Sequence, residues 1–282
     1  MKRRSALRAR REALWEQHGG WGMEKRVALI TGGARGIGRA IATALAASGW
    51  SVAICYRSSQ SDAQETVEAI QKEGAQGLAV EADVSLPEAA SDLVRQVERS
   101  WGRIDALINC AGPYHRVPLM EETLEGWHAM FNNNLHPIFY LSRLVAPGMI
   151  ERRWGRIITF SMANADQLVA QPQITAHYIA KAGVLILTRT LARILAPHGI
   201  TVNAISPGFV ASGSAPVEEL KAMEKKIPAG YVGTVDDAVA VAGFLLSDEA
   251  RYINGANIHL SGAWGSDAVS AEDFLRGELA RH

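Results

Sequence analysis

Three side chains that can transfer protons lie within five positions of one another: His177, Tyr178 and Lys181. They fall in residues 175–196, where apolar residues recur at helical spacing, so we expect all three on one helix. Side chains four residues apart share a helix face, which places His177 beside Lys181. Tyr178 is one residue later, a turn of about 100° around the helix. A local bulge or shift of register would be needed to bring Tyr178 to the same place.

Either ring could exchange a proton with a bound substrate. An imidazolium, with an ordinary pKa of about 6.5, is a competent acid, and the charge of Lys181 would lower that pKa. A phenol, with a pKa of about 10, needs a nearby cation to act near neutral pH. The segment therefore predicts acid–base chemistry and leaves open which ring performs it.

A glycine-rich run, TGGARGIG at residues 31–38, lies between a predicted strand and a predicted helix. Glycines let the backbone turn sharply and approach a pyrophosphate, whose charge then rests on the N-terminus of the following helix. The position between strand and helix supports this interpretation. The predicted contacts from this turn are Thr31, Gly32, Arg35, Gly36, Ile37 and Gly38.

Short apolar runs alternate with helical stretches along most of the chain. The predicted strands are residues 26–31, 51–56, 78–84, 106–110, 156–160, 200–205 and 256–260. The predicted helices are residues 36–47, 61–72, 87–100, 123–150 (bending near Pro137 and ending near Pro147), 175–196 and 234–247. Residues 206–233 are expected to be irregular with some helix. This alternation predicts an α/β fold, a single doubly wound parallel sheet of Rossmann type with helices on both faces.

Composition excludes several classes of protein. The 282 residues carry 29 basic and 29 acidic side chains, so a basic nucleic-acid footprint is not expected. Apolar runs are far shorter than the roughly 20 residues of a membrane span. Two cysteines in strand-like runs exclude a disulfide framework and favour the cytoplasm. We also expect no metal site.

The charge is unevenly distributed along the chain. Residues 1–22 hold six Lys or Arg against two Glu, so the remainder is net acidic. This segment lacks the apolar run of a secretory signal, which needs about 7–15 residues. The predicted organisation is a basic, disordered leader at 1–22, a single domain at 23–265 and a tail at 266–282. A length of 282 residues would by itself suggest two domains, but no linker divides the periodic pattern.

Several motifs in this order resemble the short-chain dehydrogenase/reductase family over residues 25–265. They are the TGxxxGxG spacing at 31–38, ADV at 82–84, NCAG at 109–112, PG at 207–208 and the final strand region at 253–262. The resemblance implies hydride transfer between a nicotinamide cofactor and a carbonyl or alcohol. The cofactor contacts that it implies are Asp83, Val84, Asn109, Ala111, Gly112, Lys181, Pro207 and Gly208.

The residues after the second predicted strand bear on the choice of cofactor. A carboxylate there would accept hydrogen bonds from the ribose of NAD. This chain instead has Tyr56, Arg57 and Ser58, and Arg57 can pair with a 2′-phosphate. Arg35 can add a second positive charge. We therefore predict a preference for NADP(H).

The family uses a tyrosine as proton donor, a lysine four residues later, a serine that orients substrate and an asparagine that anchors a water relay. Lys181 and Asn134 match the lysine and the asparagine, but His177 stands where the tyrosine is expected. Met162 stands at the serine position. The candidates that could replace this serine are Ser161, Asn164 and Asp166, the last by analogy with pteridine-reducing relatives.

Three hypotheses follow from this departure. His177 donates the proton itself, and reduction then weakens as the pH rises through about 6–7. Alternatively, a helix bulge brings Tyr178 into place and the chemistry is ordinary. In the third, the chain binds nucleotide without catalysis and acts as a sensor or a partner subunit.

The substrate is less constrained by the sequence. The chain is similar to 3-oxoacyl-carrier-protein reductases, which implies a 3-oxoacyl substrate, with another small ketone or a pteridine as alternatives. Apolar residues of 209–231 would form the substrate lid, and three lysines beside them suit an anionic acyl carrier or simply a solvated face: Lys221, Lys225 and Lys226. The resemblance also implies a homotetramer or homodimer built through residues 123–150, 175–196 and the last strand.

Overall fold

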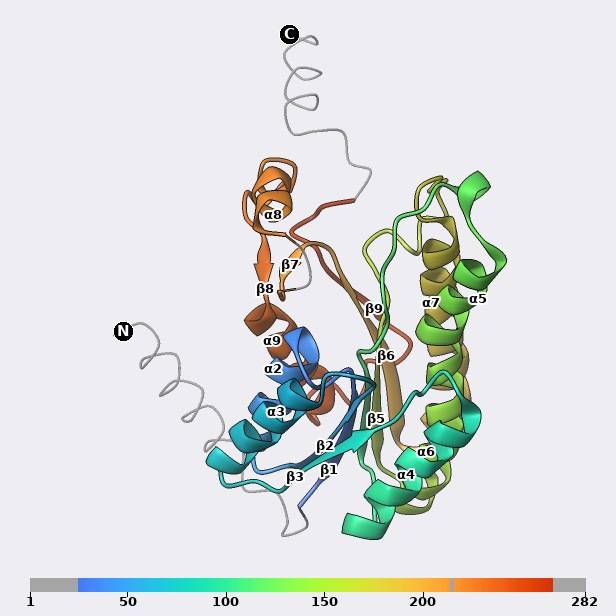
Figure 1. Cartoon of the computed structure of the whole chain (residues 1–282). Coiled ribbons are helices and arrows are strands. Elements are labelled where there is room, and N and C mark those ends of the chain that lie inside the picture. Colours follow the sequence, from blue (N-terminus) through green and yellow to red (C-terminus); the bar gives the residue numbers. More distant parts are fainter. Residues whose placement is uncertain (1–24, 214–215, 266–282) are drawn as a thin grey trace, which may run out of the picture.

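The computed structural model describes residues 25–213 and 216–265, so the predicted leader and tail lie outside the described residues. Seven parallel strands form one sheet in the order β3-β2-β1-β4-β5-β6-β9 (Figure 1). They are β1 (Val27–Thr31), β2 (Ser51–Tyr56), β3 (Gly77–Glu81), β4 (Ala106–Asn109), β5 (Gly155–Phe160), β6 (Ile200–Pro207) and β9 (Asn257–Leu260). The predicted α/β fold with a doubly wound parallel sheet is confirmed.

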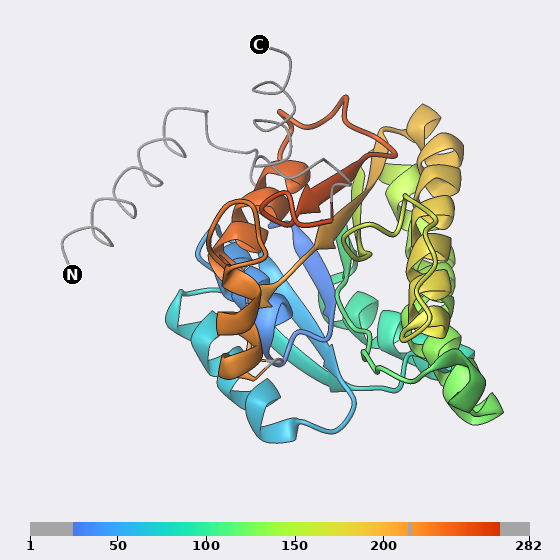
Figure 2. The ribbon, with the colours of Figure 1, turned by 90° about the horizontal axis from the view of Figure 1, so that it is seen from above.

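Helices cover both faces of this sheet (Figure 2). One layer contains α2 (Gly36–Ala46), α3 (Gln60–Lys72) and α9 (Val235–Leu246). The other contains α4 (Pro87–Trp101), α6 (His136–Arg152) and α7 (Thr175–Leu195), with α5 (Leu124–Asn134) beside α7. Above the sheet, α8 (Val217–Glu224) accompanies a small parallel pair, β7 (Val210–Ala211) and β8 (Gly233–Thr234). Short 3₁₀ turns are η1 (Leu119–Glu121) and η2 (Ala196–His198).

The core forms as two layers because successive strand residues point to opposite faces. In β1, Ala28 and Ile30 pack in the layer with α2 and α3, whereas Val27 and Leu29 pack in the layer with α4 and α6. All five residues of β1 are buried, as expected of a central parallel strand. The rigid sheet aligns the carboxyl ends of its strands, where Thr31, Asn109 and Thr159 are neighbours in register.

The predicted helical stretch over 123–150 is correct in its bend near Pro137 and wrong in its end near Pro147. The chain forms two helices that break at Leu135, because the Pro137 ring clashes with the preceding turn. The second helix continues through Pro147 to Arg152. Burial of Val145 and Met149 on either side of Pro147 explains why the helix does not end there.

Other element boundaries shift by a few residues. β3 ends at Glu81 instead of Val84. The predicted helix over 234–247 is present with Thr234 as its N-cap, and the Thr234 N–H donates to the Asp237 carboxylate over 2.7 Å. No described helix is long and apolar enough to cross a membrane.

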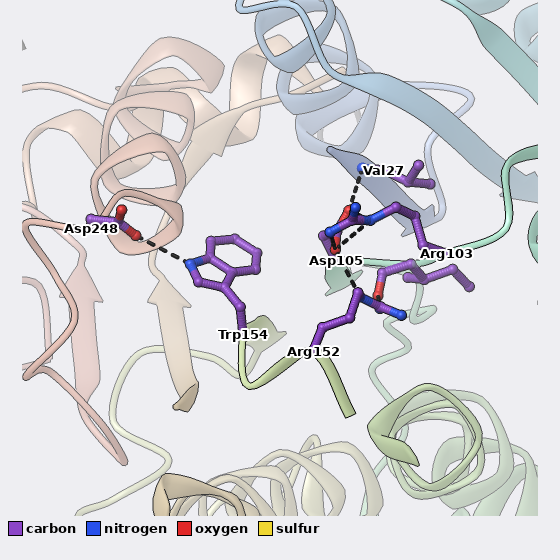
Figure 3. Close-up of polar contacts among 7 residues, drawn as sticks. Val27, Arg103, Asp105, Arg152, Trp154 and Asp248 are labelled. Carbon is purple, nitrogen blue, oxygen red and sulfur yellow. Dashed lines mark hydrogen bonds and ion pairs between the residues drawn. The ribbon is translucent and has the colours of Figure 1, made fainter. Parts of the chain in front are cut away.

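An ionic network closes the amino-terminal end of the sheet, opposite the motifs (Figure 3). The fully buried Asp105 pairs with Arg103 over 2.8 Å and with Arg152 over 3.4 Å. It also accepts a hydrogen bond from the backbone N–H of Val27 over 2.9 Å. These contacts tie β1, β4 and α6 together at one point.

Candidate active site

The glycine turn after β1 is shaped for close backbone approach. Gly32 has φ of 66°, and a side chain there would meet the backbone of Ala111 at 3.0 Å. A side chain on Gly38 would clash with the carbonyl of Gly32. The turn therefore needs glycine at both positions, and it leads directly into the N-terminus of α2. A helix N-terminus reached through such a turn suits a pyrophosphate.

The carboxyl end of β4 lies beside this turn. The Thr31 hydroxyl accepts a hydrogen bond from the N–H of Ala111 over 3.1 Å, which joins the turn to the segment after β4. Both polar side-chain atoms of Asn109 are buried without a hydrogen-bond partner among the described residues. Because an unpartnered buried amide is costly, it indicates a ligand that supplies the missing bonds. This arrangement fits a dinucleotide.

Lys181 is buried between α7 and the end of β5. Its ammonium donates to the Phe160 carbonyl over 2.9 Å, and the Ser161 hydroxyl donates to the carbonyl of Lys181 over 2.8 Å. Burial lowers the pKa of Lys181 to about 8, although the thiol of Cys110 opposes the shift. The lysine can therefore gain or lose a proton near neutral pH. Ser161, a candidate for the substrate-orienting serine, directs its hydroxyl to the protein backbone.

Asn134, His177 and Lys181 converge on Gly112–Pro113. The Asn134 side-chain N–H donates to the Pro113 carbonyl over 3.1 Å, and His177 hydrogen-bonds the backbone of the same residue. A side chain on Gly112 would clash with the Asn134 carbonyl oxygen and lie 3.4 Å from the Lys181 ammonium. Asn134 Oδ1 and His177 Nδ1 are both buried without a partner among the described residues. Two free acceptors thus remain beside a buried cation.

His177 is neutral in this environment. Burial, together with the charges of Lys181 and His115, lowers its pKa to about 3, and the hydrogen bond to Pro113 only partly opposes this. Its ring also meets Tyr114 edge-on, with ring centroids 5.1 Å apart. An imidazolium that donates a proton near pH 6–7 is therefore not favoured by the structure.

Tyr178 has a different set of contacts. Its hydroxyl donates to the carbonyl of Asn164 over 2.6 Å and accepts from the N–H of Val169 over 3.2 Å. The side chain is buried, and its polar atom is directed to the loop between β5 and α7. The α7 helix runs without a bulge from Thr175 through Tyr178 to Leu195.

The remaining serine candidates lie in the same loop. Met162, at the expected serine position, is partly buried against a small apolar cluster. Asn164 has φ of 69°, and its side chain lies against Gly265. The Asp166 carboxylate contacts His259 at 3.0 Å and the Asn257 amide at 3.2 Å. Burial raises the Asp166 pKa, but the hydrogen bonds from His259 and Asn257 outweigh it, and the net shift is downward. Asp166 thus joins the loop to β9.

The predicted selectivity residues follow β2. Arg57 donates from Nη1 to the Asn133 side-chain oxygen over 3.1 Å and lies 3.9 Å from the Asp83 carboxylate. Asp83 also accepts from the Ser85 hydroxyl over 2.7 Å. The other predicted cofactor residues lie at the carboxyl ends of four strands: Arg35, Gly36 and Ile37 after β1, Tyr56 and Ser58 at the end of β2, Val84 after β3, and Pro207 and Gly208 at the end of β6.

Sequence reasoning did not single out two neighbours of the site. Tyr114 contacts His177, and His115 forms a 2.8 Å contact with Glu122 while influencing the pKa of His177. Both lie just after the NCAG stretch at 109–112, separated from it by Pro113, and that position near an expected cofactor segment was the available signal.

The glycine turn, the unpartnered Asn109 amide and the buried lysine are features of a dinucleotide-binding α/β protein. Comparison with known proteins gives the family. The family model described as "Enoyl-(Acyl carrier protein) reductase" matches residues 32–263. The chain belongs to the short-chain dehydrogenase/reductase family and is an oxidoreductase of that family, which implies a nicotinamide cofactor.

Individual relatives differ in what they act on. A 3-oxoacyl-[acyl-carrier-protein] reductase of Staphylococcus epidermidis is 38% identical over 244 residues, covering 83% of this chain and 97% of that protein. The 3beta-hydroxysteroid dehydrogenase 1 of Eggerthella lenta is 34% identical over 245 residues, covering 85% and 94%. The crystal structure of acetoin dehydrogenase from Salmonella typhimurium has a TM-score of 0.78 at 28% identity, covering 86% and 96%.

Proposed function

We propose that this protein is an NADP(H)-dependent carbonyl reductase in which His177, rather than Tyr178, faces the reacting centre. The observation that carries the proposal is the convergence of Asn134, His177 and Lys181 on Gly112–Pro113. The Tyr178 hydroxyl, in contrast, is engaged by loop backbone on both its donor and its acceptor side.

The nicotinamide cofactor supplies or accepts the hydride when it is bound. The chain's own residues bind it and move the proton. Thr31, Gly32 and Gly38 would hold the pyrophosphate through the turn, and Asn109 would bind with its free amide. Preference for NADP(H) is supported by Arg57, which places a guanidinium after β2 where NAD-binding proteins use a carboxylate.

Proton transfer is assigned to the lysine. In the reductive direction the carbonyl oxygen of the substrate gains a proton from the Lys181 ammonium, whose pKa of about 8 suits this role. His177 donates to the Pro113 carbonyl, so as a neutral imidazole it retains a lone pair on Nδ1. That lone pair accepts the hydrogen bond of the new hydroxyl and orients it.

The substrate class is a 3-oxoacyl-type compound or another small ketone. It is supported by the names of the relatives and by three exposed lysines, Lys221 on α8 and Lys225 and Lys226 just after it, which suit an anionic carrier. Tyr114, which is 55% exposed against His177, gives the site an aromatic entrance.

The test is NADPH oxidation with a panel of ketones and 3-oxoacyl thioesters. Replacing His177 by Ala should lower kcat by about tenfold, because the hydrogen-bond acceptor that orients the new hydroxyl is lost. The matched control is His128→Ala, since His128 is exposed on α5. Equal rates for His177→Ala and the wild type would contradict the proposed role.

A second candidate is nucleotide binding without catalysis, as a sensor or a partner subunit. It is favoured by one observation: neither His177, with a pKa of about 3, nor the engaged Tyr178 is poised as an acid. NADPH binding measured by fluorescence, without oxidation by any ketone in the panel, would support this candidate over the first.

A further inference from the structure

We propose that Asn133 determines cofactor specificity by positioning the Arg57 guanidinium to receive the 2′-phosphate of NADP(H). The inference rests on the proposed preference for NADP(H) and names a new residue that serves it. Asn133 lies on α5, and Arg57 directly follows β2, 76 positions away in sequence. Arg57 Nη1 nevertheless donates to the Asn133 side-chain oxygen over 3.1 Å.

The helix fixes the orientation of the Asn133 amide. Its side-chain N–H donates to the carbonyl of Ala129, one turn earlier, over 2.8 Å. With the nitrogen held in this way, the oxygen is the atom presented to Arg57. The Asn133 amide therefore donates to the helix backbone and accepts from the guanidinium. Both contacts require the same orientation of the amide, with its oxygen toward Arg57.

Arg57 needs such a partner because its side chain is 59% exposed. A long exposed side chain loses rotamer freedom when it is ordered on a ligand, which weakens binding. Asn133 holds the guanidinium before the cofactor arrives and so reduces that cost. Because the amide is neutral, it does so without offsetting the charge that attracts a phosphate.

The contacts also leave a phosphate-binding edge open. Within the described residues, both partners of the Arg57 guanidinium approach Nη1. The edge formed by Nε and Nη2 remains for bidentate pairing with a phosphate. Asp83 lies at 3.9 Å from Nη1, and both side chains are well exposed, so water and salt screen this pair.

Fluorescence titration of the full chain with NADPH and with NADH tests the inference. Asn133→Ala should weaken NADPH binding by about threefold to tenfold, the usual effect of one exposed hydrogen bond to a charged group, and leave NADH binding unchanged. Arg57→Ala should also weaken NADPH binding, by a larger factor. Adding Asn133→Ala to Arg57→Ala should cause no further loss, because Asn133 acts through Arg57.

The matched control is Asn132→Ala, because Asn132 is the same residue type one position earlier on α5 and about 100° around the helix. If Asn133→Ala does not fold, Asn133→Ser replaces it, since a serine keeps a polar surface but is too short to reach Arg57. If Asn133 had a purely structural role, Asn133→Ala would weaken the binding of NADPH and of NADH by the same factor. The ratio of the two dissociation constants would then stay unchanged.

Different outcomes contradict the role of Asn133 and the NADP(H) preference on which that role rests. A wild-type protein that binds NADPH and NADH equally contradicts the NADP(H) preference itself. A wild-type protein that prefers NADPH through Arg57, but keeps its preference in Asn133→Ala, overturns the role of Asn133 alone. Tighter NADPH binding by Asn133→Ala would also overturn it, because Asn133 would then hold Arg57 away from the phosphate.

Discussion

The Tyr178 hydroxyl donates a 2.6 Å hydrogen bond to the carbonyl oxygen of Asn164. Asn164 adopts the left-handed backbone conformation, with φ of 69°, which asparagine tolerates better than most residues. The same hydroxyl accepts a hydrogen bond from the N–H of Val169, so one side chain of α7 is bonded to two points of the loop after β5. Tyr178 therefore orders the loop through its polar atom.

Replacing Tyr178 by Phe should loosen this loop without removing the chemistry. The change leaves a carbonyl and an N–H without their partner, which costs about 1–3 kcal/mol of stability. We expect a lower urea midpoint, with NADPH binding unchanged and kcat within about tenfold of the wild type. Urea unfolding and steady-state kinetics measure the two effects.

Tyr252→Phe is the control for that substitution, because Tyr252 is 98% exposed and lies outside the predicted site. It should change neither stability nor turnover. If Tyr178→Phe abolished turnover while leaving stability unaltered, Tyr178 would be the proton donor after all.

The fold was largely predictable because its signals are local. Apolar runs such as residues 27–31 and 157–160 encode buried strands, and helical spacing encodes the covering layers. The failures lie where packing outweighs local preference. Pro147 signals a helix end, yet α6 continues because Val145 and Met149 are buried on either side of it.

The site was predictable only in part. The i,i+4 spacing of His177 and Lys181 predicted that both lie on one helix face, and the structure has both near Gly112–Pro113. The roles of Tyr178, Asn164 and Asp166 depend on a loop whose path no local pattern encodes. The contact between Arg57 and Asn133 joins distant segments, so spacing along the chain could not indicate it.

The pH dependence of reduction should report Lys181. Burial lowers its pKa to about 8, and the ammonium is the form that gives up a proton. That form is lost as the pH rises through the pKa, so kcat should be flat below about pH 8 and fall about tenfold per unit above it. Rates measured from about pH 6 to about pH 10 test this.

The variant Lys181→Arg tests the same role of Lys181 as proton donor. An arginine keeps the positive charge but does not release its proton in this range, so turnover should be lost while NADPH still binds. Lys72→Arg, at an exposed position in the last turn of α3, should leave the profile unchanged. A wild-type profile that fell through about pH 6–7 would instead indicate an imidazolium donor at His177.

Self-association should depend on the exposed apolar residues of α6 and α7. Phe139, Ile179 and Ile186 are 48%, 43% and 65% exposed, and we propose that a second copy of the chain covers them. Ile186→Lys should shift the protein toward monomer in light scattering coupled to size exclusion, because a charge would enter an apolar interface. Leu86→Lys, at a 54% exposed site before α4, is the control. A monomeric wild type would contradict the proposal.

Asp105 should be the most costly acidic residue to remove (Figure 3). Its fully buried carboxylate is paired with the partly buried Arg103 and Arg152, so Asp105→Ala removes the acidic partner of both guanidinium groups and leaves the N–H of Val27 without its acceptor. Breaking a buried pair in this way costs about 3–5 kcal/mol, measured as a fall in the urea midpoint. Asp92→Ala removes an ion pair with Arg95 that is more than half exposed, and should cost less than about 1 kcal/mol. Equal losses for the two variants would show that the Asp105 network is not a principal support of the sheet.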